Sequence, residues 1–371
     1  MTGNSLVLEG LRKSFGSQEA VGGVSLTAEP GRIFGITGPS AAGKTTICRL
    51  VSGLESPSGG EVRCAGQRWS GVPPQRRKVA YMFESNALYP QMSVFDNIAF
   101  PLRAPNKRGL YSEAEVSTRV AEVIALTEMQ GLERRLPGEL SGGQKQRVAL
   151  CRALVQDASV YLLDEPISHL DAKLRHKLRG EVRRRQLERA VPTVWFTPDA
   201  MEALSVADQI GVIINGRLQQ VGAPDEIYVR PVNVEVARLV GDPAINLIRG
   251  QLLREGQSLR FRCEAGVVTF PERLVRQLDR QAVAKQVLLG VRPNDLALAG
   301  GTASTGTLSG TVYTVEPFGK YAIVTVRIGK ELIRIKTKEA IQAGLDQAAK
   351  VHFLRSDFLV FEDTTGRAIA S

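Results

Sequence analysis

The chain has 371 residues, of which 43% are hydrophobic and 23% charged, so it is long enough for two or more domains with full-sized cores. Its four cysteines stand far apart without a CxxC pair, which argues against a structural zinc site or a disulfide framework and suits a reducing cytosol. The formal charge of +10 is mixed along the chain except at residues 173–189 (KLRHKLRGEVRRRQLER), where helical spacing favours a solvated helix face over a nucleic-acid or membrane-binding surface.

The first ten residues, MTGNSLVLEG, lack the basic and then apolar segments of a secretion signal. No stretch reaches the ~18 consecutive apolar residues that a membrane span needs. We therefore expect a chain that is neither exported nor membrane-spanning.

The first 240 residues alternate short apolar strands with helices, which is the pattern of an α/β domain with a parallel sheet. Strands buried on both faces are expected in three continuously apolar segments, GRIFGITG (31–38), SVYLLDEP (159–166) and VPTVWFT (191–197). Apolar residues at spacings of three and four predict helices in residues 44–54, 111–129 and 141–157.

Residues 38–46, GPSAAGKTT, fit the pattern G-x-x-x-x-G-K-[ST] between a predicted strand and a predicted helix. Two glycines let the backbone curl so that successive N–H groups face phosphate oxygens, and the helix N-terminus adds its positive end. We expect Lys44 to reach the β and γ phosphates and Thr45 to offer its hydroxyl to Mg²⁺. The predicted phosphate-binding loop consists of Gly38, Pro39, Ser40, Ala41, Ala42, Gly43, Lys44, Thr45 and Thr46.

The segment VYLLDEP ends a buried strand in two acids, Asp164 and Glu165. Asp164 is placed to hold Mg²⁺ through water, and Glu165 to orient or deprotonate an attacking water. Two acids after an apolar strand are by themselves usually the first turn of a helix. Together with a phosphate loop about 120 residues upstream, they indicate a nucleotide hydrolysis site.

Residues 140–154, LSGGQKQRVALCRAL, begin a helix at Ser141, Gly142, Gly143 and Gln144, which makes another anion-binding helix end. Lying between the phosphate loop and LLDEP, this segment resembles the signature sequence of ATP-binding cassette (ABC) ATPases. The resemblance implies a P-loop NTPase core of the RecA-like α/β class over residues 1–240, with a helical subdomain inserted at about residues 86–158.

In that family two ATPase domains enclose two ATP molecules, each between the phosphate loop of one subunit and the signature helix of the other. The resemblance implies that Phe15 stacks on adenine, although an aromatic residue there also suits a strand core. It implies that Asp171, in SHLDAKLR, communicates across the dimer. Residues 79–102 match the segment that receives the coupling helix of a membrane-spanning partner.

After about residue 240 the pattern changes to alternating apolar and polar residues, with a turn expected at Gly329 and Lys330. The segments GDPAINLI (241–248), LGVRPNDLAL (289–298) and TVYTVEPFGKYAIVTVRIG (311–329) resemble the regulatory domain of ATPases from bacterial sugar importers of the maltose type. The resemblance implies an all-β, OB-like domain of the TOBE type over residues 241–371.

Two positions depart from the family pattern. Pro198 stands where the family has its switch histidine, and proline has neither an imidazole nor an N–H with which to contact the γ phosphate. Thr197 and Pro198 are predicted instead to serve as N-cap and first residue of a helix. Glu84 replaces a glutamine; its carboxylate can still ligate Mg²⁺ but adds negative charge near the γ phosphate. Either change alone is compatible with tolerated drift.

These residues give a predicted catalytic set of Glu165, Glu84 and Pro198, and a predicted Mg²⁺ set of Thr45, Asp164 and Glu84. His169, in the loop that faces the partner subunit, is a candidate to touch nucleotide across the dimer; the alternatives are an ordinary interface residue or a simple replacement for the small or polar residue that the family usually has there.

The main hypothesis is an ATPase subunit of an importer for a sugar, polyol or similar small polar solute, acting at the cytoplasmic face of the cell membrane. Its own site is expected to bind MgATP but hydrolyse it slowly, while its intact LSGGQ completes the site of a different ATPase subunit. The implied partners are that subunit, two membrane-spanning permease subunits and, indirectly, an extracytoplasmic solute-binding protein.

Two alternatives remain: an active homodimer in which Glu165 suffices, and a nucleotide-dependent regulator without a permease. A role in nucleic-acid processing is the hypothesis we favour least. Related ATPases with that role usually have tandem cassettes or a long coiled-coil insertion, and the sequence shows neither.

Overall fold

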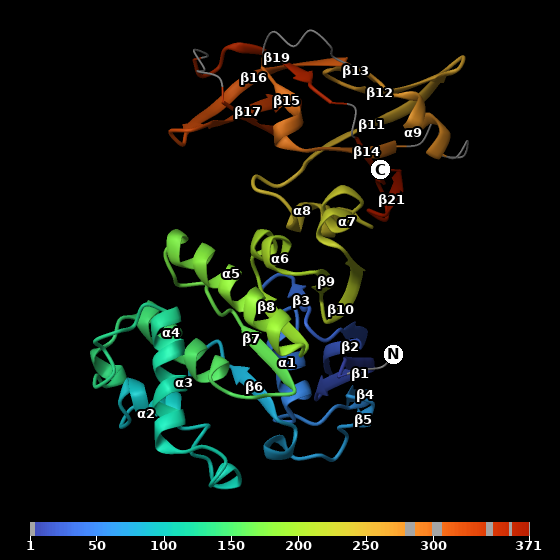
Figure 1. Ribbon diagram of the computed structural model, residues 1–371. Helices are drawn as coiled ribbons and strands as arrows, with labels where there is room; N and C mark the ends of the chain where they lie inside the picture. Colours follow the sequence, from blue (N-terminus) through green and yellow to red (C-terminus); the bar gives the residue numbers. More distant parts are fainter. Residues whose placement is uncertain (1–3, 279–285, 299–305, 339–343, 356–357, 371) are drawn as a thin grey trace. The chain divides into compact units, whose positions relative to one another are not determined.

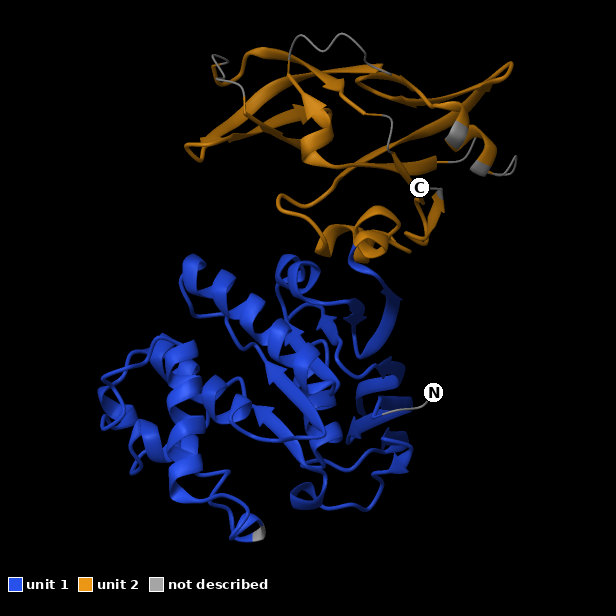
Figure 2. Ribbon diagram, in the orientation of Figure 1, with its two compact units in different colours: residues 1–224 blue, residues 225–371 orange. Residues whose placement is uncertain are grey.

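The computed structural model describes residues 4–278, 286–298, 306–338, 344–355 and 358–370. The chain divides into two compact units, residues 1–224 and 225–371 (Figure 2). Each unit is described by itself.

A four-stranded antiparallel sheet begins unit 1. Its strand order is β2-β1-β4-β5. The strands are β1 (Leu6–Phe15), β2 (Gln18–Ala28), β4 (Gly59–Cys64) and β5 (Gln67–Arg68). Phe15 pairs with Gln18, so β1 and β2 form a hairpin with a two-residue turn whose first residue, Gly16, has the positive φ of 58° that such turns require.

The second sheet of unit 1 has six strands in the order β10-β9-β3-β8-β7-β6. Five are parallel, and β10 pairs antiparallel with β9 at one edge. Every residue of β3, β7 and β8 is buried, which confirms the strands expected from their apolar runs. The strands are β3 (Ile33–Thr37), β6 (Val79–Met82), β7 (Val160–Asp164), β8 (Thr193–Thr197), β9 (Gln209–Ile214) and β10 (Arg217–Gly222).

The helices of unit 1 fall into two groups (Figure 1). Helices α1 (Lys44–Ser52), α5 (Ala172–Arg189) and α6 (Ala200–Val206) follow β3, β7 and β8 along the chain. Helices α2 (Val94–Ala99), α3 (Glu113–Leu126) and α4 (Gly142–Leu154) pack on one another between β6 and β7 in sequence. Single-turn 3₁₀ helices lie at η1 (Pro74–Arg76), η2 (Pro105–Lys107) and η3 (Pro137–Glu139).

Unit 2 is built on one antiparallel sheet. The main path runs β15-β19-β16-β13-β12-β11-β14-β20-β21, and β17 and β18 extend it from β16. Ile328 pairs with Glu331, so the expected hairpin turn at Gly329 and Lys330 is confirmed. The strands are β11 (Asn246–Glu255), β12 (Ser258–Cys263), β13 (Gly266–Thr269), β14 (Gln286–Val291), β15 (Leu296–Ala297), β16 (Gly306–Pro317), β17 (Ala322–Ile328), β18 (Glu331–Thr337), β19 (Ala348–Phe353), β20 (Leu359–Glu362) and β21 (Ala368–Ala370).

The helices of unit 2 explain why the division falls at residue 224 and not at the boundary we expected at 240. Arg292, which is 7% exposed, donates to Tyr228 O at 2.7 Å, to Ala237 O at 3.0 Å and to Val240 O. Ala237 also packs in a small core with Phe361. These contacts attach residues 228–240 to the β domain. The helices are α7 (Pro224–Val229), α8 (Val234–Leu239), α9 (Glu272–Gln277) and the 3₁₀ turn η5 (Pro293–Asp295).

Candidate nucleotide-binding site

The register of the parallel sheet brings four separate segments to one edge. Thr37 at the end of β3 pairs with Thr197 at the end of β8, and Asp164 at the end of β7 pairs with Phe196. Met82, the last residue of β6, pairs with Leu163 of β7. Because the carboxyl ends of parallel strands meet at the same edge, the loops carrying the phosphate-binding motif, Glu165, Pro198 and Glu84 all start there.

The glycines of the phosphate loop are required by close backbone approach. A Cβ at Gly38 would lie 1.9 Å from Ile213 O, and one at Gly43 would lie 2.5 Å from Ala20 O. Gly43 has φ 102°, and Ala41 also adopts a positive φ of 62°. The loop therefore curls tightly at the N-terminus of α1, as a cradle of backbone N–H groups for phosphate requires.

Lys44 lies under this loop and is 7% exposed. Its Nζ donates to Gly38 O and to Pro39 O, both at 2.8 Å. An ammonium has three N–H donors, so these two bonds leave one donor for a phosphate oxygen. Burial lowers the pKa of Lys44, while the charges of Glu165, Asp164 and Glu84 raise it.

Asp164 is 1% exposed, and its Oδ2 has no hydrogen-bond partner among the described residues. Burial raises the pKa of Asp164 to about 6; a hydrogen bond from Thr45 lowers it, and the charges of Glu84 and Glu165 raise it. A buried, unpartnered carboxylate oxygen beside a hydroxyl fits the oxygen ligands that Mg²⁺ prefers. Within the described part of the chain no three His, Cys, Asp or Glu side chains are grouped so that they could hold a metal ion.

The two departures from the family pattern both lie at this edge. Glu84 is exposed after β6, and its charge raises the pKa values of Lys44, Asp164 and Glu165. For Glu165, burial is the largest cause of the raised pKa, while Lys44 and His169 lower it. Glu84 is thus a third carboxylate acting on the phosphate-loop lysine.

Pro198 is half-buried between β8 and α6, and the helix start we predicted there is wrong. Helix α6 begins at Ala200 and its N-cap is Asp199, whose carboxylate accepts from Met201 N at 2.9 Å and Glu202 N at 3.2 Å. The Thr197 hydroxyl accepts from Asp199 N at 3.1 Å. Asp199 displaces Thr197 as cap because an anion at the positive helix end accepts two orphan N–H groups at once.

Helices α4 and α5 begin with side-chain caps. Ser141 is the N-cap of α4 in a capping box with Gln144, and both Ser141 and Gly142 are exposed. Asp171 caps α5 by accepting from Leu174 N at 3.0 Å. His169 lies exposed on the loop between β7 and α5, with Nδ1 3.1 Å from Ser168 Oγ.

Phe15 is 49% exposed at the end of β1, with Lys13 Nζ 4.8 Å from its ring centroid. The alternative that Phe15 is a strand core residue therefore fails. The hairpin that carries Phe15 lies next to the phosphate loop. The backbone carbonyl that approaches Gly43 most closely belongs to Ala20 of β2, the second strand of this hairpin.

Gln146 belongs to the site region but was missed from the sequence. It is 2% exposed on α4, and its amide bonds the loop that contains Glu165. The available signal was a glutamine in helical register with the buried residues Leu150 and Ala153. A polar side chain on an apolar helix face needs a partner.

A groove of about 950 Å³ is lined by η1, β6, the segments 83–89 and 100–111, and the end of α4 with the residues after it. Its lining is aromatic and basic, with Tyr81, Phe83, Tyr89, Phe100, Tyr111, Arg76, Lys78, Lys107 and Arg152 among its residues. Phe100 is 39% exposed, and its ring centroid lies 4.5 Å from that of Tyr89. The groove therefore presents apolar rings next to positive charge.

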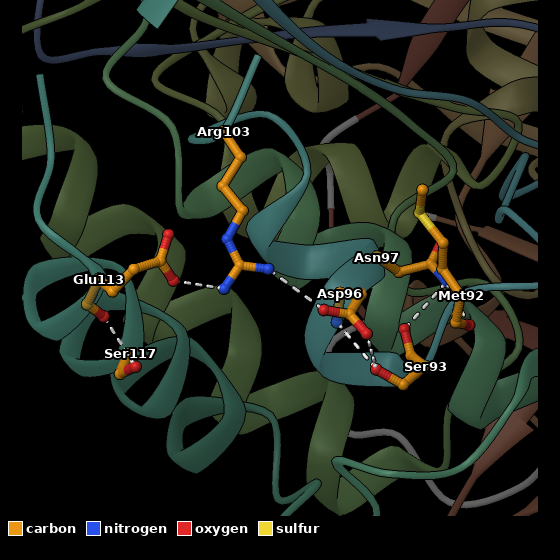
Figure 3. Close-up of polar contacts among 7 residues, drawn as sticks. All are labelled: Met92, Ser93, Asp96, Asn97, Arg103, Glu113 and Ser117. Atoms are coloured by element: carbon orange, nitrogen blue, oxygen red, sulfur yellow. Dashed lines mark hydrogen bonds and ion pairs between the residues drawn. The ribbon is translucent and has the colours of Figure 1, made fainter. Parts of the chain in front are cut away.

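Polar contacts of Asn97 in α2 hold the segment that carries the groove residue Tyr89, and those from Asn97 to Met92 and Ser93 are drawn in Figure 3. Asn97 is fully buried; its side chain accepts from Tyr89 N at 2.8 Å and donates to Tyr89 O, Met92 O and Ser93 O at 3.0 to 3.1 Å. Arg103 bridges Asp96 and Glu113 at 3.2 and 2.6 Å (Figure 3). The groove wall is thus held by the first turn of α2.

A phosphate loop with a buried lysine, a buried carboxylate at the end of a strand two places away in the same sheet, and an inserted helical subdomain define a P-loop ATPase. The family model "ABC transporter" matches residues 21–168, and the model "TOBE domain" matches residues 289–361. The chain belongs to the ABC transporter ATPases, as the sequence motifs predicted, with a C-terminal TOBE domain.

Relatives match four fifths or more of the chain. The chain is 37% identical to the trehalose/maltose import ATP-binding protein MalK of Thermococcus litoralis, over 96% of this chain and 97% of that protein. It is 37% identical to the alpha-glucoside transport ATP-binding protein AglK of Rhizobium meliloti (88% and 87%), and 40% identical to the spermidine/putrescine import ATP-binding protein PotA of Rubrobacter xylanophilus (82% and 80%).

Solved structures match more than half of the chain. A dimeric structure of the bacterial ABC transporter cassette MJ0796 is similar with a TM-score of 0.55 and 26% identity, over 59% of this chain and 98% of that one. A post-hydrolysis dimer of the same cassette bound to ADP and Pi gives a TM-score of 0.55 and 27% identity over the same shares of the two chains. Among the described residues of the present chain, no helix is both long and apolar enough to cross a membrane.

Proposed function

We propose that this chain is the ATP-binding subunit of an importer for a carbohydrate, polyol or similar small polar solute, and that it acts at the cytoplasmic face of the cell membrane. The full-length similarity to import ATP-binding proteins for trehalose/maltose and for alpha-glucosides supports this solute class. In this proposal the membrane and receptor subunits determine the solute specificity, and the ATPase subunit does not.

In this proposal the loop 38–46 holds the phosphates of ATP, with Lys44 on the β and γ groups. Thr45, Asp164 and Glu84 hold Mg²⁺, which neutralises phosphate charge when it is bound. Glu165 accepts a proton from the attacking water. The raised pKa of Glu165, caused by burial and by Glu84, makes it a stronger base than an exposed glutamate.

The chain's own site is proposed to hydrolyse ATP slowly, and the observation that carries this is Pro198 at the strand end beside the phosphate loop. Its ring offers no donor or acceptor to the γ phosphate. Glu84 supports the same conclusion because, beside Asp164 and Glu165, it adds negative charge where the γ phosphate would bind, and we expect this repulsion to outweigh the gain in basicity of Glu165. The capped, exposed start of α4 is intact and completes the site of a second, different ATPase subunit.

The experiment that tests the proposal is purification from native membranes by a tag on this chain. We expect two permease subunits and a second ATPase subunit to be retained. A permease retained with this ATPase alone would establish a homodimer, and the absence of any permease would favour a stand-alone nucleotide-dependent regulator.

The aromatic and basic groove is proposed to receive the coupling helix of the permease. Phe100→Asp is expected to abolish retention of the permease, because it places a charge on the exposed ring surface that an apolar helix face would cover. ATP affinity of the purified chain should stay within about twofold, since the groove is separate from the phosphate loop. Pull-down and nucleotide titration of the same preparation measure both, and Leu187→Asp, a 63% exposed position on α5, is the matched control.

Phe15 is proposed to stack on adenine. Phe15→Ala is expected to weaken ATP binding about tenfold or more, because stacking on an aromatic ring contributes roughly 1–3 kcal/mol per base. Phe15→Trp should restore affinity. Equilibrium titration with ATP and with inorganic triphosphate, which lacks the base, separates stacking from a general loss: an equal loss for both ligands would contradict stacking.

A further inference from the structure

The buried amide of Gln146 joins two segments of unit 1. Gln146 lies in the second turn of α4, just after the helix start at 141–144, of which Ser141 and Gly142 are exposed. Its Nε2 donates to Glu165 O at 2.6 Å and to Ser168 Oγ at 3.0 Å, and its Oε1 accepts from His169 N at 3.0 Å. A single side chain of the helix thus bonds three residues of the loop after β7.

That loop holds a conformation that needs support. Glu165 has φ 49°, in the left-handed region that is unfavourable for a non-glycine residue. Its N–H donates to Phe196 O of β8 at 2.9 Å, and its carbonyl accepts from Gln146 and, at 3.3 Å, from Ser168 Oγ. The backbone of Glu165 is therefore fixed between β8 on one side and α4 on the other.

The loop also packs directly on the first turn of α4. A Cβ at Gly143 would lie 3.1 Å from His169 O and 3.6 Å from the Leu170 side chain. Gln146 is 2% exposed, so water does not compete for its bonds. The helix start and residues 165–170 therefore have little freedom to shift separately.

We propose that Gln146 is a positioning residue that makes the start of α4 and the loop 165–169 move as one body, so that the nucleotide bound in this chain's site changes the helix start presented to the second site. The inference rests on the proposed function, in which the start of α4 faces the nucleotide of the second ATPase subunit. A subunit that hydrolyses its own ATP slowly still reports its nucleotide state through this link.

The test is hydrogen exchange of the full chain with and without MgATP, at a concentration at which light scattering shows a monomer. In the wild-type chain MgATP is expected to slow exchange at residues 38–46, 165–170 and 141–146. In Gln146→Leu the protection of 38–46 should remain, while that of 141–146 should fall about tenfold, the effect of roughly one net hydrogen bond.

Two further variants make the test decisive. Gln156→Leu is the matched control, because Gln156 Nε2 donates to Arg152 O four residues before it, and it should keep the wild-type pattern. Ser168→Ala removes one partner of Gln146 without emptying space in the helix, and it should give a smaller loss in the same direction; it decides the matter if Gln146→Leu does not fold.

Unchanged protection of 141–146 in folded Gln146→Leu, or in Ser168→Ala where the first variant is unfolded, would overturn the proposal. A wild-type chain in which MgATP fails to protect residues 38–46 would overturn the proposed function instead.

Discussion

Pro198→His is expected to raise the ATP turnover of the purified chain about a hundredfold at dimer-forming concentration, because a positioned polar group at a phosphoryl-transfer site commonly contributes that much or more. Thr197 ends β8 beside Thr37, the last residue before the phosphate loop, so a side chain at 198 starts next to the γ-phosphate region. The substitution leaves the α6 cap intact, since the cap is Asp199. Steady-state phosphate release measures the result.

Three controls separate a restored catalytic contact from a change of fold. Pro198→Ala removes the ring without supplying an imidazole and should stay near the wild-type rate. Glu165→Gln in the Pro198→His background should return the rate to the wild-type level or below, because the proposed base is lost. Glu84→Gln alone should raise turnover less than Pro198→His, since it removes a charge but adds no γ-phosphate contact.

Equal turnover of the wild-type chain and Pro198→His would mean that Glu165 works without the histidine, and the chain would then be an active homodimer. If the wild-type chain and Pro198→His both turned over ATP slowly, but became highly active when a co-purified ATPase was added, the working site would lie on the partner subunit. The effect of Pro198 would then have to be measured in the mixed dimer.

The parts predicted correctly from the sequence are those that depend on local pattern. Strands β3, β7 and β8 are continuously apolar because both faces are buried, and the spacing of Gly38, Gly43 and Lys44 is dictated by the cradle they form. In a parallel sheet the carboxyl ends share an edge, so the meeting of Asp164 with the phosphate loop followed from topology alone.

The parts that were missed depend on competition or on distant partners. At β8 both Thr197 and Asp199 are good capping residues, and only the geometry decides that Asp199 takes both N–H groups. Arg292 attaches residues 228–240 to the β domain by bonds to carbonyls more than 50 residues away, which no window of sequence contains.

Gln146 was missed for the same reason. Its bond to the Glu165 carbonyl spans 19 residues, and a glutamine inside LSGGQKQ does not stand out from its polar neighbours. The one sequence signal for Gln146 is that it shares a helix face with buried residues. This position predicts that its side chain has a hydrogen-bond partner but does not identify the partner.

Asp164→Asn is expected to stabilise the nucleotide-free protein at pH 7.5 by about 3 kcal/mol while weakening the Mg²⁺ dependence of ATP binding at least about tenfold. Burial raises the pKa of Asp164 from its ordinary value to about 6, so the ionised carboxylate is less favourable in the folded than in the unfolded chain. The amide is nearly the same size and carries no charge. A substitution that raises folding stability and weakens ligand binding is expected where a functional residue, here Asp164, is unfavourable for folding.

The direction of the pKa shift of Asp164 determines the pH range over which its effect on stability changes. Because the folded pKa lies above the unfolded one, the group favours folding at acid pH, and this contribution is lost as pH rises from about 4 through about 6. The difference in unfolding free energy between Asp164→Asn and the wild type should therefore grow across that window and level off above it. Urea unfolding monitored by tryptophan fluorescence at pH 4.5, 6 and 7.5 measures it.

Asp157→Asn is the control of opposite sign. Burial would raise the pKa of Asp157, but hydrogen bonds from Tyr111 and Arg119 outweigh it and lower the pKa, so removing this charge should destabilise the fold at pH 7.5. If Asp164→Asn also destabilised the protein, the buried carboxylate would not be under electrostatic strain. If Mg²⁺ still tightened ATP binding to it as in the wild type, the metal ion would have to be held by other groups, and Asp164 would act on the site only through its charge.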